Sequence, residues 1–201
     1  MGIRMASAAR WLAVVALSLT VAAPAAAGSV EDSLWAILRE GGHVVLMRHT
    51  STEVTAAFDP PGFRLEDCAT QRNLSPLGRD EARGIGAAFR ARQVPVGRVL
   101  SSRWCRCLDT ARLAFGAADP WPALDSFVED HGREPEQTRE VRGLVGGPPA
   151  GGNVILVTHQ ANVAAVTGLS PAPGEMIILT PRGDGSFRVA GRLLLSIRAS
   201  N

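Results

Sequence analysis

The sequence predicts an α/β fold that forms a single domain. Three short apolar runs, residues 43–47, 94–100 and 153–157, each stop abruptly on polar side chains, which is typical of buried strands in a parallel sheet. Stretches with a helical spacing of apolar residues lie between these runs. The chain has 201 residues, of which 46% are hydrophobic and 20% charged, which suits one domain with a sizeable core.

The first 27 residues are typical of a secretory signal peptide. Arg4 and Arg10 supply positive charge, residues 11–21 are apolar, and alanines at positions 25–27 provide a cleavage site. The apolar stretch is short for a membrane span, and no charged stop-transfer run follows it. We therefore expect a mature domain over residues 28–201 that is periplasmic or secreted and has no membrane span.

The charge of the mature chain argues against nucleic acid as a partner. The full chain has a net charge of +2, and removal of Arg4 and Arg10 leaves 19 basic against 19 acidic residues. A chain without net charge lacks the excess of positive groups that binds phosphate backbones.

The N-terminal part of the domain predicts a helix, a strand and a loop. Residues 30–39 have apolar side chains at helical spacing and are followed by two glycines suited to a helix end. The strand at residues 43–47 ends on Arg48 and His49. Residues 50–65 lack periodicity, and we expect this loop to form one wall of a site beside Arg48 and His49.

The next part predicts a helix, a strand and a second helix. Ser75 is expected to cap a helix that starts with Pro76 and continues to about Arg92. The strand at residues 94–100 leads through a short polar turn into a helix over residues 104–115. Residues 103–106 therefore lie around a helix N-terminus, where backbone N–H groups favour anions.

The C-terminal half predicts further alternation and a terminal hairpin. Residues 121–124 are expected to form a short third strand, followed by a polar loop over 125–134 and a helix over 136–145. The strand at residues 153–157 ends on Thr158 and His159, and a helical stretch begins at Asn162. Two extended runs, 176–179 and 187–195, flank a glycine-rich turn and predict a hairpin.

The polar ends of three strands predict a site for phosphoryl chemistry. In a parallel sheet the carboxyl ends lie on one edge, so Arg48-His49, Ser102 with Arg106, and His159 are expected to converge. Two arginines suit a phosphate, because guanidinium groups donate paired hydrogen bonds and keep their charge. Two histidines can act as nucleophile and as donor. A lone histidine at a strand end would more often be structural, and His43 and His131 have no such neighbours in the pattern.

At this point the sequence resembles the histidine phosphatase, or phosphoglycerate mutase-like, superfamily. The resemblance covers about residues 43–168 and rests on four segments in the family's order. These are Arg48-His49-Thr50 for the family's Arg-His-Gly, Leu74-Ser75 with Gly78 and Ala82 at its second helix, Ser102 to Arg106 with Thr110-Ala111, and Val157-Thr158-His159.

The resemblance implies a three-layer α/β/α sandwich with a mostly parallel central sheet. It also implies a metal-independent, acid-type phosphatase that needs no cofactor and hydrolyses phosphomonoesters through a phosphohistidine intermediate. His49 would attack the phosphorus, while Arg48, Arg106 and His159 would hold the phosphoryl oxygens. Thr50 departs from the family's glycine, and its side chain would narrow the pocket or add a hydroxyl contact.

The general acid is expected in the loop after the third strand. Family members that act on ordinary esters draw a carboxylic acid from this region, which here offers Asp125, Glu129 and Asp130. Asp130 is the preferred candidate and Glu129 the alternative. The loop is short compared with the mutase branch, which favours a phosphatase.

The three cysteines of the mature chain predict one disulfide and one free thiol. Export permits a disulfide, and Cys68, Cys105 and Cys107 are an odd number. A zinc site is the alternative, but Cys-x-Cys with one distant cysteine is a poor ligand pattern. The resemblance implies that Cys68 pairs with Cys105 and that Cys107 is free.

Two rival functions remain beside the phosphomonoesterase. A phosphohistidine phosphatase would need less acid help, but its signalling partners are usually cytoplasmic, which conflicts with export. A non-catalytic phosphate-binding protein would keep the fold without turnover. Location alone favours a small phosphorylated substrate of the cell envelope, such as a sugar phosphate, and the oligomeric state is not predicted.

Other arginines, including Arg64, Arg72 and Arg103, are expected on a solvated surface by default.

Overall fold

The structure is a computed structural model that describes residues 2, 29–54 and 58–196. The expected signal peptide over residues 1–27 lies outside the described residues, apart from residue 2. In the described part of the chain, no helix is both long enough and apolar enough to cross a membrane.

A six-stranded sheet forms the centre of the domain, in the order β3-β2-β4-β1-β5-β6. The first four strands in this order are parallel to one another, whereas β5 and β6 form an antiparallel hairpin at one edge. The mostly parallel sheet and the terminal hairpin are therefore confirmed. The strands are β1 (Val44–Arg48), β2 (Val96–Ser101), β3 (Asp119–Pro120), β4 (Asn153–Thr158), β5 (Met176–Pro181) and β6 (Phe187–Leu193).

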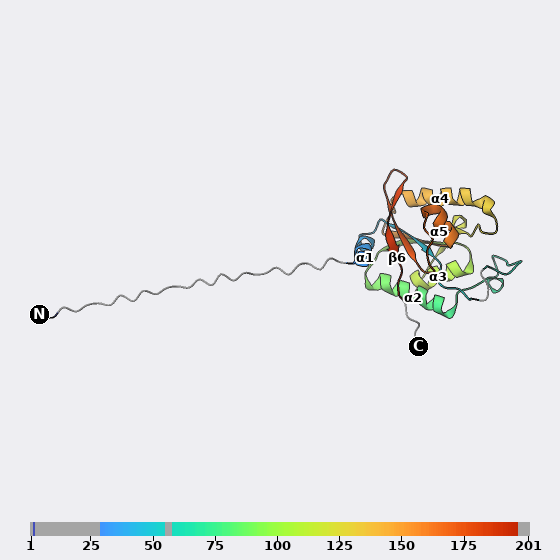
Figure 1. The fold of residues 1–201 in the computed structure, drawn as a ribbon, viewed down its shortest axis with the longest axis horizontal. Helices are drawn as coiled ribbons and strands as arrows, with labels where there is room; N and C mark the ends of the chain where they lie inside the picture. The colour runs from blue at the N-terminus through green and yellow to red at the C-terminus, as the bar shows by residue number, and fades with distance from the viewer. Residues whose placement is uncertain (1, 3–28, 55–57, 197–201) are drawn as a thin grey trace.

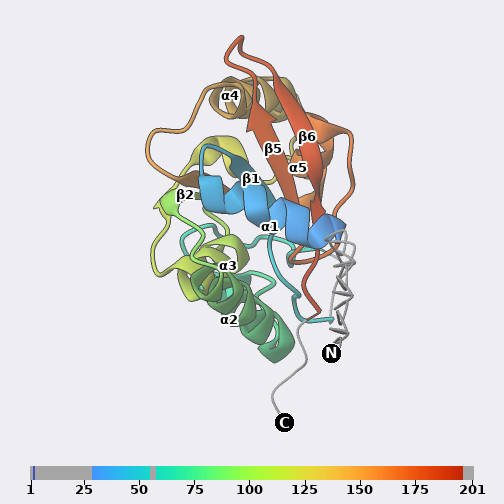
Figure 2. The same cartoon turned by 90° about the vertical axis from the view of Figure 1, so that its left-hand side faces the viewer.

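Helices cover both faces of the sheet, which confirms the three-layer architecture (Figures 1 and 2). Alternate side chains of β1 point to opposite faces, as the pleat of a strand requires. Val45 and Met47 pack with one group of helices, and Val44 and Leu46 pack with the other. The first group is α1 (Val30–Glu40), α2 (Pro76–Ala91) and α3 (Cys105–Phe115), and the second is α4 (Glu134–Gly146) and α5 (Gln160–Thr167).

The start of α2 is held against the segment that follows β1. The hydroxyl of Ser75 accepts a hydrogen bond from the Gly78 amide at 3.0 Å, and Pro76 opens the helix, as expected. A Cβ atom on Gly78 would lie only 1.8 Å from the Ser51 carbonyl oxygen. Only glycine allows this close approach, which places α2 beside the residues that follow His49.

Most expected elements are shifted by one or two residues at an end, as for α4, which begins at Glu134 rather than at residue 136. Two differences lie close to the site. Residues 121–124 do not form a strand: β3 contains only Asp119 and Pro120, and Pro122–Leu124 is a 3-10 helix. Pro122 has no N–H to give to a sheet, while the Leu124 amide donates to the Trp121 carbonyl within the turn. Helix α5 begins at Gln160 rather than Asn162, directly after His159.

Candidate active site

The carboxyl ends of three neighbouring strands meet at one pocket. In the register of the sheet Arg48 lies opposite Thr158, and Ser101 lies opposite Val157, so the residues that follow these strands are neighbours. The pocket has a volume of about 450 Å³. Its lining includes all of the expected catalytic side chains, namely Arg48, His49, Arg106, His159, Glu129 and Asp130.

His49 is buried and its tautomer is determined by one contact. Its Nδ1 lies 2.8 Å from the Thr50 carbonyl oxygen, and because a carbonyl only accepts hydrogen bonds, Nδ1 carries the proton. The other ring nitrogen, Nε2, then keeps a free lone pair. Burial and the positive charge of Arg106 lower the pKa of His49 to about 3, so the ring is neutral at neutral pH.

Thr50 makes a hydroxyl contact and does not narrow the pocket. Its side chain is fully buried, lies outside the pocket lining, and has Oγ1 3.1 Å from Oγ1 of Thr110. The Thr110 hydroxyl in turn donates to the Arg106 carbonyl oxygen at 2.7 Å. Thr50 therefore connects the segment after β1 to the first turn of α3, which carries Arg106.

Arg106 forms a buried ion pair that the sequence pattern did not predict. Its Nη1 donates to Oδ1 of Asp59 at 2.8 Å, and both side chains are at least nine-tenths buried. Asp59 belongs to the loop that was expected to form a wall of the site, and it lines the pocket. A contact across 47 positions leaves no local pattern in the sequence.

Arg72 is a third arginine of the pocket, and its expected surface position was wrong. It lines the pocket beside Arg48 and donates through Nη1 to the Thr52 hydroxyl at 2.7 Å. Burial, followed by the charge of Arg106, lowers the pKa of Arg72 from its usual range. The signal that would have located Arg72 is the disulfide, because residues 68–73 are attached through it to the residue before Arg106.

His159 is held by a chain of hydrogen bonds on the side away from Arg106. Its Nε2 lies 2.9 Å from the Ser102 hydroxyl, which itself donates to Oδ1 of Asp125 at 3.3 Å. The proton therefore resides on Nε2, and Nδ1, 3.5 Å from Nη2 of Arg106, presents a lone pair. Burial, then the charge of Arg106, holds the pKa of His159 well below its usual range.

The three carboxylates of the loop after β3 lie in different environments. Asp125 is fully buried and forms an ion pair with Arg103 at 2.6 Å, so it is not free to serve as an acid. This pairing also corrects the expectation that Arg103 is simply a surface side chain. Glu129 and Asp130 are exposed and both line the pocket.

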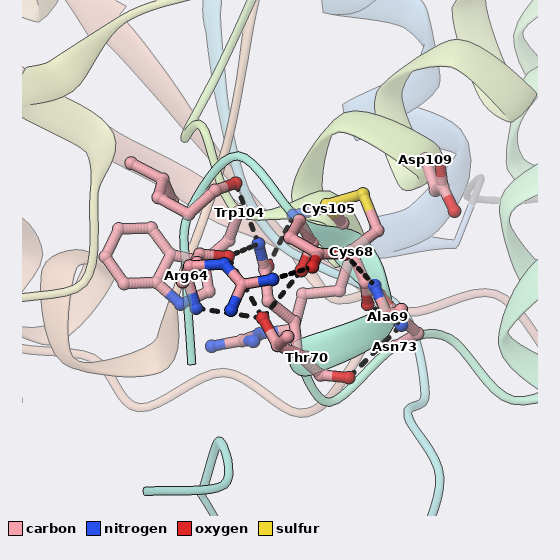
Figure 3. Close-up of a disulfide and its surroundings, with 12 residues drawn as sticks. Arg64, Cys68, Ala69, Thr70, Asn73, Trp104, Cys105 and Asp109 are labelled. Atoms are coloured by element: carbon pink, nitrogen blue, oxygen red, sulfur yellow. Dashed lines mark hydrogen bonds and ion pairs between the residues drawn. A yellow bond between two sulfur atoms is a disulfide. The ribbon is translucent and has the colours of Figure 1, made fainter. Parts of the chain in front are cut away.

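The disulfide between Cys68 and Cys105 is present, as expected (Figure 3). It connects the short 3-10 helix Cys68–Thr70 to the N-terminus of α3, and the Cys105 amide also donates to Oε1 of Gln71 at 3.0 Å. Cys107 is free and buried, with Sγ 3.6 Å from Nε2 of His159. Arg64 is exposed and pairs with Asp67, as a surface arginine would.

No protein-family model matches the chain, and no curated protein matches its sequence. Solved structures with a similar fold include the protein histidine phosphatase SixA in complex with tungstate, at 19% identity and a TM-score of 0.54, over 75% of this chain and 96% of that one. A putative phosphohistidine phosphatase SixA from Agrobacterium tumefaciens has 22% identity and a TM-score of 0.51, over 77% and 99%.

A phosphoserine phosphatase from Entamoeba histolytica, in complex with 3-phosphoglyceric acid, has 13% identity and a TM-score of 0.56, over 77% of this chain and 98% of that one. Each of these chains is covered almost completely, so the likeness extends over whole domains. At such low identity the likeness concerns the arrangement of the backbone. The chain therefore has the fold of the histidine phosphatases.

Proposed function

We propose that the protein is a phosphatase that hydrolyses small phosphomonoesters through a phosphohistidine on His49. One observation carries this proposal: a neutral histidine with a free Nε2 lies in a pocket lined by four arginines. A neutral imidazole is the nucleophilic form, and the arginines offset the charge of the group that is transferred. The volume of about 450 Å³ suits a small substrate.

The first step transfers the phosphoryl group to the enzyme. Nε2 of His49 attacks phosphorus in line, a nitrogen–phosphorus bond forms, and the bond to the leaving oxygen breaks. Arg48 and Arg106 hold the phosphoryl oxygens. His159 can donate to one of them from Nδ1 after it takes up a second proton, which a bound dianion favours. Asp130, or Glu129 in its place, gives the leaving oxygen a proton.

The second step returns His49 to its starting state. The same carboxylate, now ionised, accepts a proton from water as the water oxygen attacks phosphorus. The nitrogen–phosphorus bond breaks, and inorganic phosphate leaves with His49 neutral again. Each step uses only side chains that line the pocket and needs no further reactant than water.

The names of the structural neighbours support phosphatase chemistry but differ in substrate. Two are phosphohistidine or protein histidine phosphatases and one is a phosphoserine phosphatase. Phosphohistidine is therefore the alternative substrate for this chain. The disulfide supports a periplasmic or secreted protein, because disulfides persist in oxidising compartments. An envelope sugar phosphate is the candidate substrate that fits this location.

The test compares His49→Ala with the unchanged protein on p-nitrophenyl phosphate. We expect turnover to fall by at least about a thousandfold, since the nucleophile is lost. His43→Gln is the matched control, because His43 lies at the opposite end of the same strand and outside the pocket. Acid-labile phosphate on His49 after rapid quenching would support the intermediate. Full activity of His49→Ala would overturn the proposal, and phosphate binding without turnover in the unchanged protein would indicate a non-catalytic role.

A further inference from the structure

Four arginines line the pocket, and three of them, Arg48, Arg72 and Arg106, are anchored to the protein through Nη1. Nη1 of Arg48 donates to the Pro171 carbonyl at 3.1 Å, and Nη1 of Arg72 donates to the Thr52 hydroxyl. Nη1 of Arg106 donates to the carboxylate of Asp59. Of these three anchors, only Asp59 carries a charge of its own. The fourth arginine, Arg133, is 37% exposed and lies 3.7 Å from the carboxylate of Asp125.

Asp59 is buried and its carboxylate accepts three hydrogen bonds. Oδ1 accepts from Nη1 of Arg106 and from the Arg72 amide, both at 2.8 Å, and Oδ2 accepts from Nε1 of Trp104 at 3.0 Å. The side chain is 7% exposed. Burial alone raises the pKa of Asp59, but the hydrogen bond and charge of Arg106 outweigh it and lower the pKa below its usual value. Asp59 is therefore ionised at neutral pH.

The charge of the buried and half-buried groups around the two histidines can be counted. Arg48, Arg72 and Arg106 contribute three positive charges, Asp59 contributes one negative charge, and both histidines are neutral, which leaves +2. A phosphomonoester, like inorganic phosphate, carries between about 1.5 and 2 negative charges at neutral pH. Without Asp59 the same groups would carry +3. Glu129 and Asp130 are exposed, so water and salt screen their charges more strongly, and Arg133 lies 3.7 Å from the carboxylate of Asp125, which offsets its charge.

We propose that Asp59 is an internal counter-anion of the pocket, which holds Arg106 in place and limits the affinity of the pocket for inorganic phosphate. A phosphatase must release phosphate after each cycle, and three uncompensated arginines would retain it. The carboxylate lowers this affinity without removing any of the groups that orient the phosphoryl oxygens. This inference rests on the proposed function, for which phosphate is the product.

Asp59→Asn tests the inference because it removes the charge and keeps the shape. The amide oxygen can still accept from Arg106 and from the Arg72 amide, so Arg106 keeps an anchor. We expect inorganic phosphate to bind about tenfold tighter by isothermal titration calorimetry, the size expected when one charge a few ångströms from a bound dianion is removed. Product inhibition should become stronger by the same factor.

Asp109→Asn is the matched control for the loss of one negative charge. Asp109 lies on the same helix as Arg106, pairs with Arg79 near the surface, and is absent from the pocket lining. The Asp109→Asn variant should bind phosphate with the same affinity as the unchanged protein. Unchanged or weaker phosphate binding in Asp59→Asn would overturn the inference, because a purely structural role predicts no gain in affinity.

Asp59→Asn places an amide N–H against the indole N–H of Trp104, which can cost stability. If the thermal unfolding midpoint shows that the variant does not fold, the same comparison is made in Trp104→Phe, which lacks that donor, with Trp104→Phe alone as the reference. Calorimetry with phosphate needs no turnover. An unchanged protein without activity on any phosphate ester would therefore count against the proposed function, while the phosphate affinities would still decide the role of Asp59.

Discussion

Acidification should destabilise the protein through His49, by an amount that follows from its environment. The pKa of His49 is about 3 in the folded protein, against 6.5 for an unperturbed histidine. Because the folded pKa is depressed, the unfolded chain binds a proton between these values that the folded protein does not bind. Stability is therefore lost as the pH falls from 6.5 towards 3, by about 1.4 kcal/mol per pH unit. Between about pH 7.5 and about pH 4.5 this amounts to about 3 kcal/mol.

The measurement is urea unfolding at both pH values in phosphate-free buffer, for the unchanged protein and for His49→Gln. Carboxylates and His159 contribute to the acid response of both proteins, so the comparison isolates His49. The unchanged protein should lose about 3 kcal/mol more than His49→Gln over this interval. His131→Gln, which removes an exposed histidine, controls for the loss of an imidazole. Equal losses in His49→Gln and in the unchanged protein would refute the assignment of a buried, neutral His49.

Three further predictions concern the acid, the third arginine and the disulfide. Asp130→Asn should slow hydrolysis of an alkyl phosphate by about a hundredfold and that of p-nitrophenyl phosphate much less, because nitrophenolate leaves without a proton; the same pattern in Glu129→Gln instead would assign the acid to Glu129. Arg72→Ala should raise KM for p-nitrophenyl phosphate by about tenfold through the loss of a guanidinium in the pocket, and an unchanged KM would contradict its contact with substrate. Cys68→Ser should lower the free energy of unfolding by about 4 kcal/mol, since the bridge closes a loop with a sequence separation of 37 residues. Urea unfolding under non-reducing conditions measures this, and a variant as stable as the unchanged protein would contradict the prediction.

Most elements of the fold follow from local patterns. The strands that became β1, β2 and β4 are apolar runs with polar ends, and their register brings Arg48, His49 and His159 together without any further information. Ser75 and Gly41 mark helix ends through hydrogen bonds made within a few residues, and Pro76 marks one through its fixed φ angle. The failure at residues 121–124 is also local, because the run is short and Pro122 favours the turn.

The residues that the sequence did not reveal act through contacts between distant segments. Asp59 lies in a loop without periodicity and Arg72 follows the 3-10 helix Cys68–Thr70, and they reach Arg106 across separations of 47 and 34 positions. Asp125 looked like a candidate acid because it lies in the appropriate loop, but its ion pair with Arg103 and its burial remove it from that role. No local sequence pattern predicts the burial of Asp125 or its ion pair with Arg103.

The sequence by itself determined which chemical groups meet at the edge of the sheet, because strand ends and their polar residues are set by short-range patterns. It therefore led to His49 between two arginines and to a fold that the structure confirms. Only the tertiary structure decided the charge state of these groups. Burial and neighbouring guanidiniums make His49 neutral, the Thr50 carbonyl selects its tautomer, and Asp59 offsets the positive charge of Arg106. Such effects depend on distances through space and on exclusion of water, which arise only when the chain is folded.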